Sequence, residues 1–330
     1  MEKSSRDALL SLLACPSDRS ALTPNGNRLT CEHGHHFPLV DGIPVMLLPD
    51  RPQTHRAATS SIRSAYFPMP HDGERPAETG IVDQFVQDSI VLVAGQLYRP
   101  IKGRLTRYPV ANLELPPGEG RLFLDIGCSW GRWSIAAARL GYRALGIDPN
   151  LEAIRAARRI CAAEGVSAEF IVGDARFLPI RSGVVDLAFS YSVLQHFAPS
   201  DVRLTLKEIR RVLAPGGSSL IQMANAAGLR NFYQQARRKF RPAGGFDVRY
   251  WPLSEMMETF SQAIGPSAVK AEGFFGPGIQ PRDRDLHPSA YRAVISASEL
   301  MRQLAHVIPG LVELADSVYI TSIVTTDQRS

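Results

Sequence analysis

Three acidic residues follow three successive apolar stretches and could line one binding crevice. Asp125 lies in an apolar stretch that leads into a turn with glycine at positions 127 and 131, and Asp148 and Asp174 close the next two stretches. The carboxyl ends of parallel strands meet at one edge of an open α/β sheet, where such sheets bind ligands. A single acid at such a position could equally cap a helix. Three in succession instead predict a ligand site.

The turn after Asp125 differs from a dinucleotide-binding fingerprint. That motif would carry glycine where this chain has Ser129. The carboxylate of Asp125 suits a ligand with an ammonium group better than a pyrophosphate. Asp148 could accept hydrogen bonds from both hydroxyls of a ribose, and Asp174 with the adjacent backbone could read an adenine edge.

Two side chains after the fourth apolar stretch could move a proton. Tyr191 ends that stretch and His196 follows five positions later. A histidine beside a ligand crevice is a candidate general base because its proton affinity lies near neutral pH. It could also pack beneath the following helix or cap it, and the sequence leaves both interpretations open.

Strand-like and helix-like patterns alternate through the middle of the chain. The predicted strands span 121–128, 142–148, 168–174, 184–191 and 218–223, and the predicted helices span 130–140, 151–164 and 201–213. The dense turn-forming segment Pro215-Gly216-Gly217 is expected to end the last of these helices. Such alternation predicts a parallel sheet with helices on both faces.

The flanking regions are less regular. Apolar residues at three- and four-residue spacing predict a helix over 81–98, whereas 49–80 shows no periodicity and is predicted to be a linker. Beyond residue 225 we expect helices at 229–241, 253–264 and 291–307 and strands at 269–275 and 317–325.

Composition restricts the classes of protein that the chain can represent. Its 330 residues suit one large and one small domain or two medium ones, and 45% hydrophobic with 21% charged residues is ordinary globular usage. No apolar run reaches the ~20 residues that span a bilayer, and residues 1–13 show an apolar patch without the cleavage site of a signal peptide. Four widely spaced cysteines do not form a disulfide framework. We therefore expect a cytoplasmic protein.

The net charge of +5 does not by itself indicate an anionic partner. The basic residues are nearly all arginine, with five lysines in the whole chain, and no run of five or more basic residues occurs. This bias is typical of a GC-rich genome. The sequence contains no signal for an oligomeric state.

Residues 121–225 resemble the class I S-adenosylmethionine-dependent methyltransferases, particularly the branch with ubiquinone-biosynthesis-type methyltransferases. The matching stretches are 125–131, 146–148, 173–175, 185–191 and 211–217. The resemblance implies a doubly wound, mostly parallel seven-stranded sheet whose last strands, 269–275 and 317–325, form an antiparallel hairpin.

The same resemblance implies roles for individual residues. The residues that it assigns to the cofactor are Asp125, Gly127, Cys128, Gly131, Asp148, Asp174, Ala175 and Ser190. Gly127 and Gly131 would shape the methionine pocket, Asp148 would hold the ribose, and Asp174 with Ala175 would hold the adenine. The family often has glycine where this chain has Ser129. The serine side chain is expected to narrow the turn.

The methyl donor of this family is a sulfonium that is already activated. The protein mainly aligns the acceptor with the methyl group and excludes water. A general base is required only for a weakly acidic acceptor, and His196 and Tyr191 are the candidates.

The N-terminal segment resembles the small zinc-ribbon-like domain of the tRNA-methyltransferase activator family. The matching residues are 13–16, Cys31, 34–38 and 41–44, with an Asp41-Gly42 turn followed by a predicted strand. Cys15, Cys31 and His35 are three possible zinc ligands, and Asp18 stands where a second cysteine is expected. A tetrahedral site needs four ligands. A ribbon held by packing alone remains the alternative.

We therefore predict three units and one main activity. Residues 1–50 form the zinc-ribbon-like domain, 51–80 a linker, and 81–330 the methyltransferase domain, with a cofactor-binding core at 121–225 and acceptor-side elements at 81–120 and 226–310. The expected reaction is methyl transfer to a small or medium-sized acceptor, such as a sugar, lipid, quinone or secondary metabolite. The alternatives are an RNA base methyltransferase and a catalytically silent binding protein with this fold.

The acceptor side favours a small molecule over nucleic acid. The basic residues within 230–251 alternate with aromatic residues and Asp247 and do not form a run. RNA binding requires a broad positive face because phosphate contacts carry the affinity. The apolar residues Met256, Met257, Phe260, Phe274 and Phe275 suggest an enclosed apolar acceptor pocket.

Overall fold

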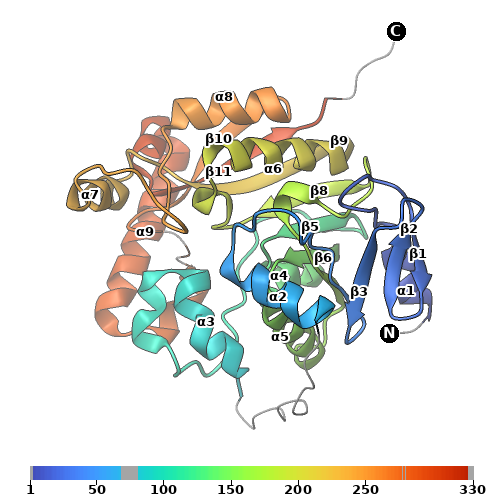
Figure 1. Cartoon of the computed structure of the whole chain (residues 1–330). Helices are drawn as coiled ribbons and strands as arrows, with labels where there is room; N and C mark the ends of the chain where they lie inside the picture. Colours follow the sequence, from blue (N-terminus) through green and yellow to red (C-terminus); the bar gives the residue numbers. More distant parts are fainter. Residues whose placement is uncertain (1–2, 68–80, 277, 279, 326–330) are drawn as a thin grey trace.

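The computed structural model describes residues 3–67, 81–276, 278 and 280–325. A seven-stranded sheet forms its centre, in the spatial order β10-β11-β9-β8-β5-β6-β7 (Figure 1). Its strands are β5 (Leu122–Ile126), β6 (Arg143–Asp148), β7 (Ala168–Val172), β8 (Val185–Ser190), β9 (Leu213–Ala224), β10 (Ser267–Gly273) and β11 (Ser317–Ile323). Strands β5 to β9 pair in parallel, and β11 pairs antiparallel with both β9 and β10. The predicted fold, including the terminal hairpin, is confirmed.

Helices cover both faces of this sheet. The helices of the described chain are α1 (Lys3–Leu10), α2 (Arg56–Tyr66), α3 (Gln84–Ala94), α4 (Arg132–Arg139), α5 (Leu151–Ala163), α6 (Pro199–Val212), α7 (Leu229–Arg237), α8 (Leu253–Ala263) and α9 (Ser289–Val307). In Figure 1, α6 and α8 lie above the sheet and α4 and α5 below it. All five residues of β5 are buried because this central strand is covered on both faces.

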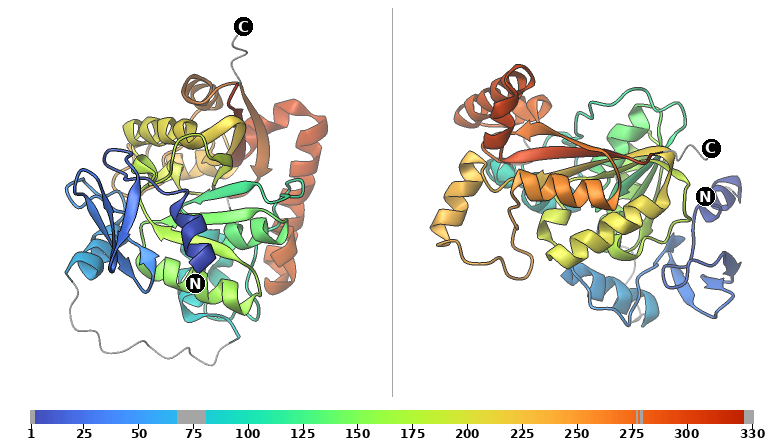
Figure 2. Two further views of the ribbon diagram at one scale, coloured as in Figure 1. Left: turned by 90° about the vertical axis from the view of Figure 1, so that its right-hand side faces the viewer. Right: turned by 90° about the horizontal axis from the view of Figure 1, so that it is seen from above.

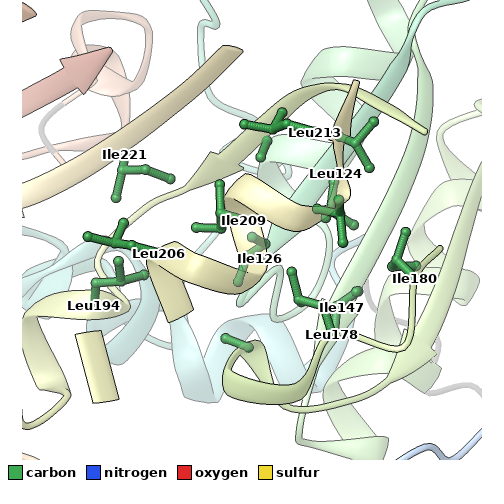
Figure 3. Close-up of a cluster of buried hydrophobic side chains, with 14 of the residues drawn as sticks. Leu124, Ile126, Ile147, Leu178, Ile180, Leu194, Leu206, Ile209, Leu213 and Ile221 are labelled. Carbon is green, nitrogen blue, oxygen red and sulfur yellow. The ribbon is translucent and has the colours of Figure 1, made fainter. Parts of the chain in front are cut away.

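Alternate residues of the central strands pack into two separate hydrophobic cores, one on each face of the sheet. Leu124 and Ile126 point toward α6, where Leu206 and Ile209 meet them (Figure 3). Phe123 belongs to the opposite core. This division follows from the two-residue period of a strand, which sends neighbouring side chains to opposite faces.

The start of β9 differs from the prediction. Residues 215–217 were expected to precede the strand, but β9 begins at Leu213, directly after α6. The register with β8 shifts there, because Val185 pairs with Leu213 whereas Leu187 pairs with Ser218. The Pro-Gly-Gly segment is therefore accommodated as a bulge near the start of the strand.

A small antiparallel sheet precedes the main one. Its strands are β1 (Leu22–Asn25), β2 (Arg28–Cys31), β3 (His36–Val40) and β4 (Ile43–Pro44). Asp41 and Gly42 both have positive φ, 52° and 72°, as the tight hairpin turn between β3 and β4 requires. The predicted ribbon-like arrangement is confirmed.

The small sheet is attached to the edge of the large one. The segment after β4 lies along β7, where the amide of Met46 donates to the carbonyl of Val172 at 2.7 Å. Leu29 and Phe37 are buried in the same cluster as Leu124. Figure 2 shows the small sheet against one side of the α/β layers. This contact covers an edge strand that would otherwise expose unpaired backbone groups.

The prediction that residues 49–80 lack regular structure is wrong for α2. His55 caps this helix by accepting from the amide of Ala57, and the Ser61 hydroxyl donates to Pro149 O at 2.8 Å and accepts from Leu151 N at 2.9 Å. The buried face of α2 is made of small residues, so it gives no apolar stripe. Docking against α5 stabilises a helix that its sequence alone would not. The remainder of the predicted linker, 68–80, lies outside the described residues.

Candidate functional site

A cleft of about 150 Å³ opens at the carboxyl ends of the parallel strands. It lies where the strand order reverses, because β6 follows β5 on one side and β8 lies on the other. Of the residues predicted for the cofactor, Gly127, Asp148, Asp174 and Ala175 line this cleft, and both proposed bases line it too. The topology thus brings together residues up to 69 positions apart, from Gly127 to His196.

The turn after β5 has a conformation that only glycine fits at its first position. Gly127 has φ of 77°, and a Cβ added there would lie 2.2 Å from Cγ2 of Val193. The amides of Gly127 and Cys128 donate to the carbonyl of Ile147 at 2.7 and 3.1 Å. These contacts fix the turn against β6 and keep its open side toward the cleft.

Ser129 occupies the left-handed region, with φ of 48°. This conformation explains why glycine is common at the position, since it disfavours side chains. The amide of Ser129 donates to Oδ2 of Asp148 at 2.9 Å. The departure from the family pattern therefore leaves the contact between the turn and the β6 acid intact.

Asp148 is the best-placed acid of the cleft. Its Oδ1 accepts from the amide of Asn150 and its Oδ2 from Ser129, each at 2.9 Å. Burial raises the pKa of Asp148, and these amides lower it. A carboxylate has about four acceptor positions, so two backbone bonds leave capacity for a ligand with paired hydroxyls.

Asp174 also has a structural role, as a helix cap and as the partner of an arginine. It caps the short 3-10 helix η2 (Ala175–Phe177) by accepting from the amide of Arg176, and its carboxylate also pairs with the Arg176 guanidinium at 2.7 Å. The same guanidinium donates to Pro52 O at 2.6 Å. The acid therefore holds the segment before α2 against the cleft, and its contact with adenine stays a prediction.

Four other predicted cofactor residues lie beneath the cleft and do not line it. Asp125 is 1% exposed, and its Oδ2 accepts from the Ser134 hydroxyl at 2.7 Å. Burial raises the pKa of Asp125 to about 7. The Ser190 hydroxyl donates to Ile126 O at 2.9 Å, which ties β8 to β5. Cys128 is buried, and Gly131 is the N-cap residue that directly precedes α4. In this structure these residues support the turn from below.

Several lining residues were missed from the sequence, among them three from segments remote from the glycine turn. His55 caps α2, Ser89 lies in α3, and Phe246 lies in the loop after α7. The ring of Phe246 stacks on His196 at 4.3 Å between centroids and meets the edge of His55 at 5.0 Å. No local pattern marks these residues, because each reaches the cleft from a segment remote from the glycine turn.

His196 has the geometry of a neutral base. Its Nδ1 lies 2.8 Å from the carbonyl oxygen of Phe246, so Nδ1 carries the proton and Nε2 keeps its lone pair. Burial lowers the pKa of His196, with a further lowering by Arg249, whereas the Phe246 carbonyl and Asp247 raise it. The net lowering of the pKa favours the unprotonated imidazole.

Tyr191 lines the cleft, but its hydroxyl is engaged by residues outside the cleft. The hydroxyl donates to Oε1 of Glu272 and accepts from the amide of Gly278, each at 2.7 Å. Burial and the neighbouring Glu272 raise the pKa of Tyr191 well above its ordinary value. Both hydrogen-bonding directions of the hydroxyl are occupied, so among the two candidates the geometry favours His196 as the base.

The cleft fits the cofactor that the family uses. Gly127 leaves room that a Cβ would fill, and Asp148 offers a half-buried carboxylate. The Ser89 hydroxyl also lines the cleft and has no hydrogen-bond partner within the described chain. Unpartnered buried polar atoms of this kind indicate a ligand that completes their hydrogen bonding.

The four predicted metal ligands converge in the small sheet. One ligand atom from each of Cys15, Asp18, Cys31 and His35 lies within 4.8 Å of the others. Nδ1 of His35 lies 3.3 Å from Sγ of Cys31 and 2.9 Å from Oδ2 of Asp18. Two thiols, an imidazole and a carboxylate in this arrangement fit a tetrahedral zinc ion.

Comparison with known proteins agrees with the geometry. Residues 123–217 match a family described as a methyltransferase domain. The chain is 30% identical over 166 residues to the ubiquinone biosynthesis O-methyltransferase of Rhizobium etli, covering 49% of this chain and 66% of that protein. The Caulobacter vibrioides enzyme of the same name is 26% identical over 182 residues, covering 54% and 70%.

A solved structure matches over a similar region. It is a chain of the complex between the Haloferax volcanii Trm112 methyltransferase activator and a methyltransferase, with a TM-score of 0.45, 21% identity, and coverage of 64% of this chain and 86% of that one. This chain spans about two thirds of the length of the curated relatives that it matches first. Within the described residues, none of the helices has the length and apolar character needed to cross a membrane.

Proposed function

A class I S-adenosylmethionine-dependent methyltransferase domain occupies residues 123–217, and from this premise we propose that the chain methylates a small or medium-sized acceptor. The single observation that carries the proposal is the cleft that Gly127, Asp148 and Asp174 line together. The glycine turn gives close backbone approach and the two acids offer hydrogen-bond acceptors.

When bound, S-adenosylmethionine supplies a sulfonium methyl group that is already activated for transfer to a nucleophile. We assign the ribose hydroxyls to Asp148 and the adenine edge to Asp174 with Ala175. The rings of His55 and Phe246 cover the cleft, where they would exclude water from the reacting atoms. His196 would take the proton of a hydroxyl acceptor at Nε2.

Asp148→Ala is expected to weaken binding of S-adenosylhomocysteine by about 1.5–3 kcal/mol, since charge-assisted hydrogen bonds to the ribose are lost. Isothermal titration calorimetry on the full chain measures this, with Asp50→Ala, an exposed acid outside the cleft, as the matched control. Equal affinity of wild type and Asp148→Ala would place the ribose elsewhere. Absence of binding by wild-type protein would contradict the proposed function itself.

We propose zinc for the cluster of Cys15, Asp18, Cys31 and His35. Protein produced with zinc in the medium is expected to contain about one equivalent per chain, and Cys31→Ser is expected to release it. Elemental analysis measures the metal, and Cys161→Ser, a buried thiol of α5 outside the cluster, is the control. Metal-free wild-type protein with the same melting curve would favour a ribbon held by packing.

The structure changes the argument about the acceptor. Met256, Phe260 and Phe274 were expected to line an apolar pocket, but all three are fully buried in the core that also holds Ile221 and Val318. That interpretation was wrong because their apolar side chains pack α8 and the end of β10 into the core. They therefore give no support to an apolar acceptor.

The RNA alternative lacks a basic face on the small sheet. Between residues 7 and 50 the arginines are Arg19 and Arg28, and Arg19 pairs with Glu208 at 3.0 Å. RNA affinity at physiological salt depends on several phosphate contacts, which this part of the chain does not offer. The alternative of a silent binding protein is disfavoured by the two acids retained in the cleft.

A further inference from the structure

A second cavity, of about 430 Å³, lies beside the cleft. The open face of β9, β10 and β11 forms its floor, and residues from 112–114, 280–282 and α9 form its walls. The residues that line it include Leu220, Lys270, Glu272, Gln280, Arg302 and Tyr319. The volume of this cavity is therefore larger than that of the cleft, and its lining residues are more polar.

Glu272 is the chemically exceptional group of this wall. The residue is 8% exposed, and its Oε1 accepts from the Tyr191 hydroxyl at 2.7 Å. Its Oε2 is buried and accepts no hydrogen bond from any residue that the structure describes. Leaving a buried carboxylate oxygen unpaired destabilises the folded protein, so the arrangement calls for a donor from outside the chain.

The Tyr191–Glu272 pair joins the two spaces. Tyr191 lines the cleft, whereas Glu272, whose carboxylate accepts from the Tyr191 hydroxyl, lines the cavity. The amide of Gly278 fixes the hydroxyl from the other side at 2.7 Å. A molecule in the cavity that donates to Glu272 is therefore separated from the cleft by one side-chain pair.

The rest of the wall favours a polar occupant. The ammonium of Lys270 lies 5.6 Å from the centre of the Tyr319 ring and has no carboxylate within 4.0 Å in the part of the chain described. Arg302, by contrast, is paired with Glu299 and Glu114 at 2.8 and 3.1 Å. The aromatic and aliphatic surface of the wall comes from Tyr319, Leu113, Leu220, Ala271 and Pro281.

We propose that this cavity is a second ligand site, separate from the cleft, and that it takes a molecule rich in hydroxyl or amino groups, such as a sugar or cyclitol unit, with one donor on Oε2 of Glu272. The ring of Tyr319 offers an apolar face to such a unit, and Lys270 and Gln280 offer donors to its oxygens. A quinone ring without hydrogen-bond donors would leave Glu272 unpaired.

Saturation-transfer NMR on the full chain tests this with three probes of similar size. D-glucosamine and methyl α-D-glucopyranoside carry donors, and 2,3-dimethoxy-5-methyl-1,4-benzoquinone carries none. With S-adenosylhomocysteine at saturation, the two sugars are expected to bind and the quinone is not. Glu272→Gln is expected to weaken sugar binding about tenfold or more, because the charged acceptor is lost.

Glu258→Gln on the exposed face of α8 is the matched control and should leave sugar binding unchanged. A role of Glu272 that is only structural would lower the melting temperature of the ligand-free protein in Glu272→Gln. Removal of an unpaired buried charge is instead expected to preserve or raise it.

Each other outcome overturns the inference. Equal sugar binding by wild type and Glu272→Gln would remove Glu272 from the site. Quinone binding, or no binding by either sugar at 20 mM, would exclude a polyol as the ligand of this cavity. That concentration is ~50-fold above a sub-millimolar Kd. Binding of S-adenosylhomocysteine is measured separately, so failure here leaves the proposed function standing.

Discussion

His196→Ala is expected to lower kcat/KM for a hydroxyl-bearing acceptor by about 100-fold or more, the usual contribution of a positioned general base. The imidazole lines the cleft, and its Nδ1 is fixed on the Phe246 carbonyl, so Nε2 is the atom free to take a proton. Release of S-adenosylhomocysteine under saturating cofactor measures the effect. His306→Ala, an exposed histidine of α9, is the matched control.

The same assignment predicts the pH dependence. Since burial and Arg249 lower the pKa of His196, the base form persists to lower pH than for a free histidine. The acid limb of kcat/KM should therefore have its midpoint below about 6.5. An NMR titration of the His196 ring in the ligand-free protein gives the pKa independently of the acceptor. A His196 pKa above 6.5, or an acid limb retained in His196→Ala, would contradict the assignment.

Arg132→Met is expected to lower the free energy of unfolding by about 3–5 kcal/mol, the usual cost of leaving one partner of a buried ion pair alone. Arg132 and Asp283 are 1% and 2% exposed at their side chains, and their charged atoms lie 3.0 Å apart. The Tyr98 hydroxyl donates to the same carboxylate at 2.5 Å. Without the guanidinium, the Asp283 charge is buried with this hydroxyl as its remaining partner. Urea unfolding of the full chain measures the loss.

Two variants make this prediction specific. Arg143→Met removes the half-exposed pair with Glu169, at 3.0 Å, and is expected to cost about 1 kcal/mol or less because solvent screens such pairs. Adding Asp283→Leu to Arg132→Met should recover part of the loss, since it removes the stranded charge. An Arg132→Met variant that unfolds at the same urea concentration as Arg143→Met would show that the buried pair contributes little.

The Arg132–Asp283 pair also bears on the two cavities. Arg132 begins α4 directly after the glycine turn, and Asp283 lies in the 3-10 helix η4 (Pro281–Leu286), which adjoins the wall of the larger cavity. The pair therefore links the turn of the cleft to the segment that carries Gln280. A variant that loses stability here is expected to disturb both spaces, so ligand binding should be measured only below its unfolding transition.

The sequence by itself determined the strands, the order of the helices between them, and the acids at the strand ends. Each of these features depends on residues that are close together in the sequence. The apolar run of β5 is buried on both faces, and the turn after it needs glycine because Gly127 has a φ of 77°, which other residues avoid. The candidate metal-ligand cluster was also predictable, because Cys15, Asp18, Cys31 and His35 lie within 21 positions of one another. Their convergence requires the fold of a single small sheet.

Only the tertiary structure decided what surrounds these residues. The cover of His55 and Phe246, the contact of Tyr191 with Glu272, and the ion pair of Arg132 with Asp283 each join segments at least 80 positions apart. Such contacts produce no periodic pattern in the sequence. A single polar or aromatic residue has the same sequence context whether its side chain faces solvent, a cavity or a buried partner. Met256 and Phe260 show the converse, since an apolar side chain has the same pattern in a pocket wall as in the core where these two lie. Chain pairing over long distances, and not local propensity, settles which of these places each side chain occupies.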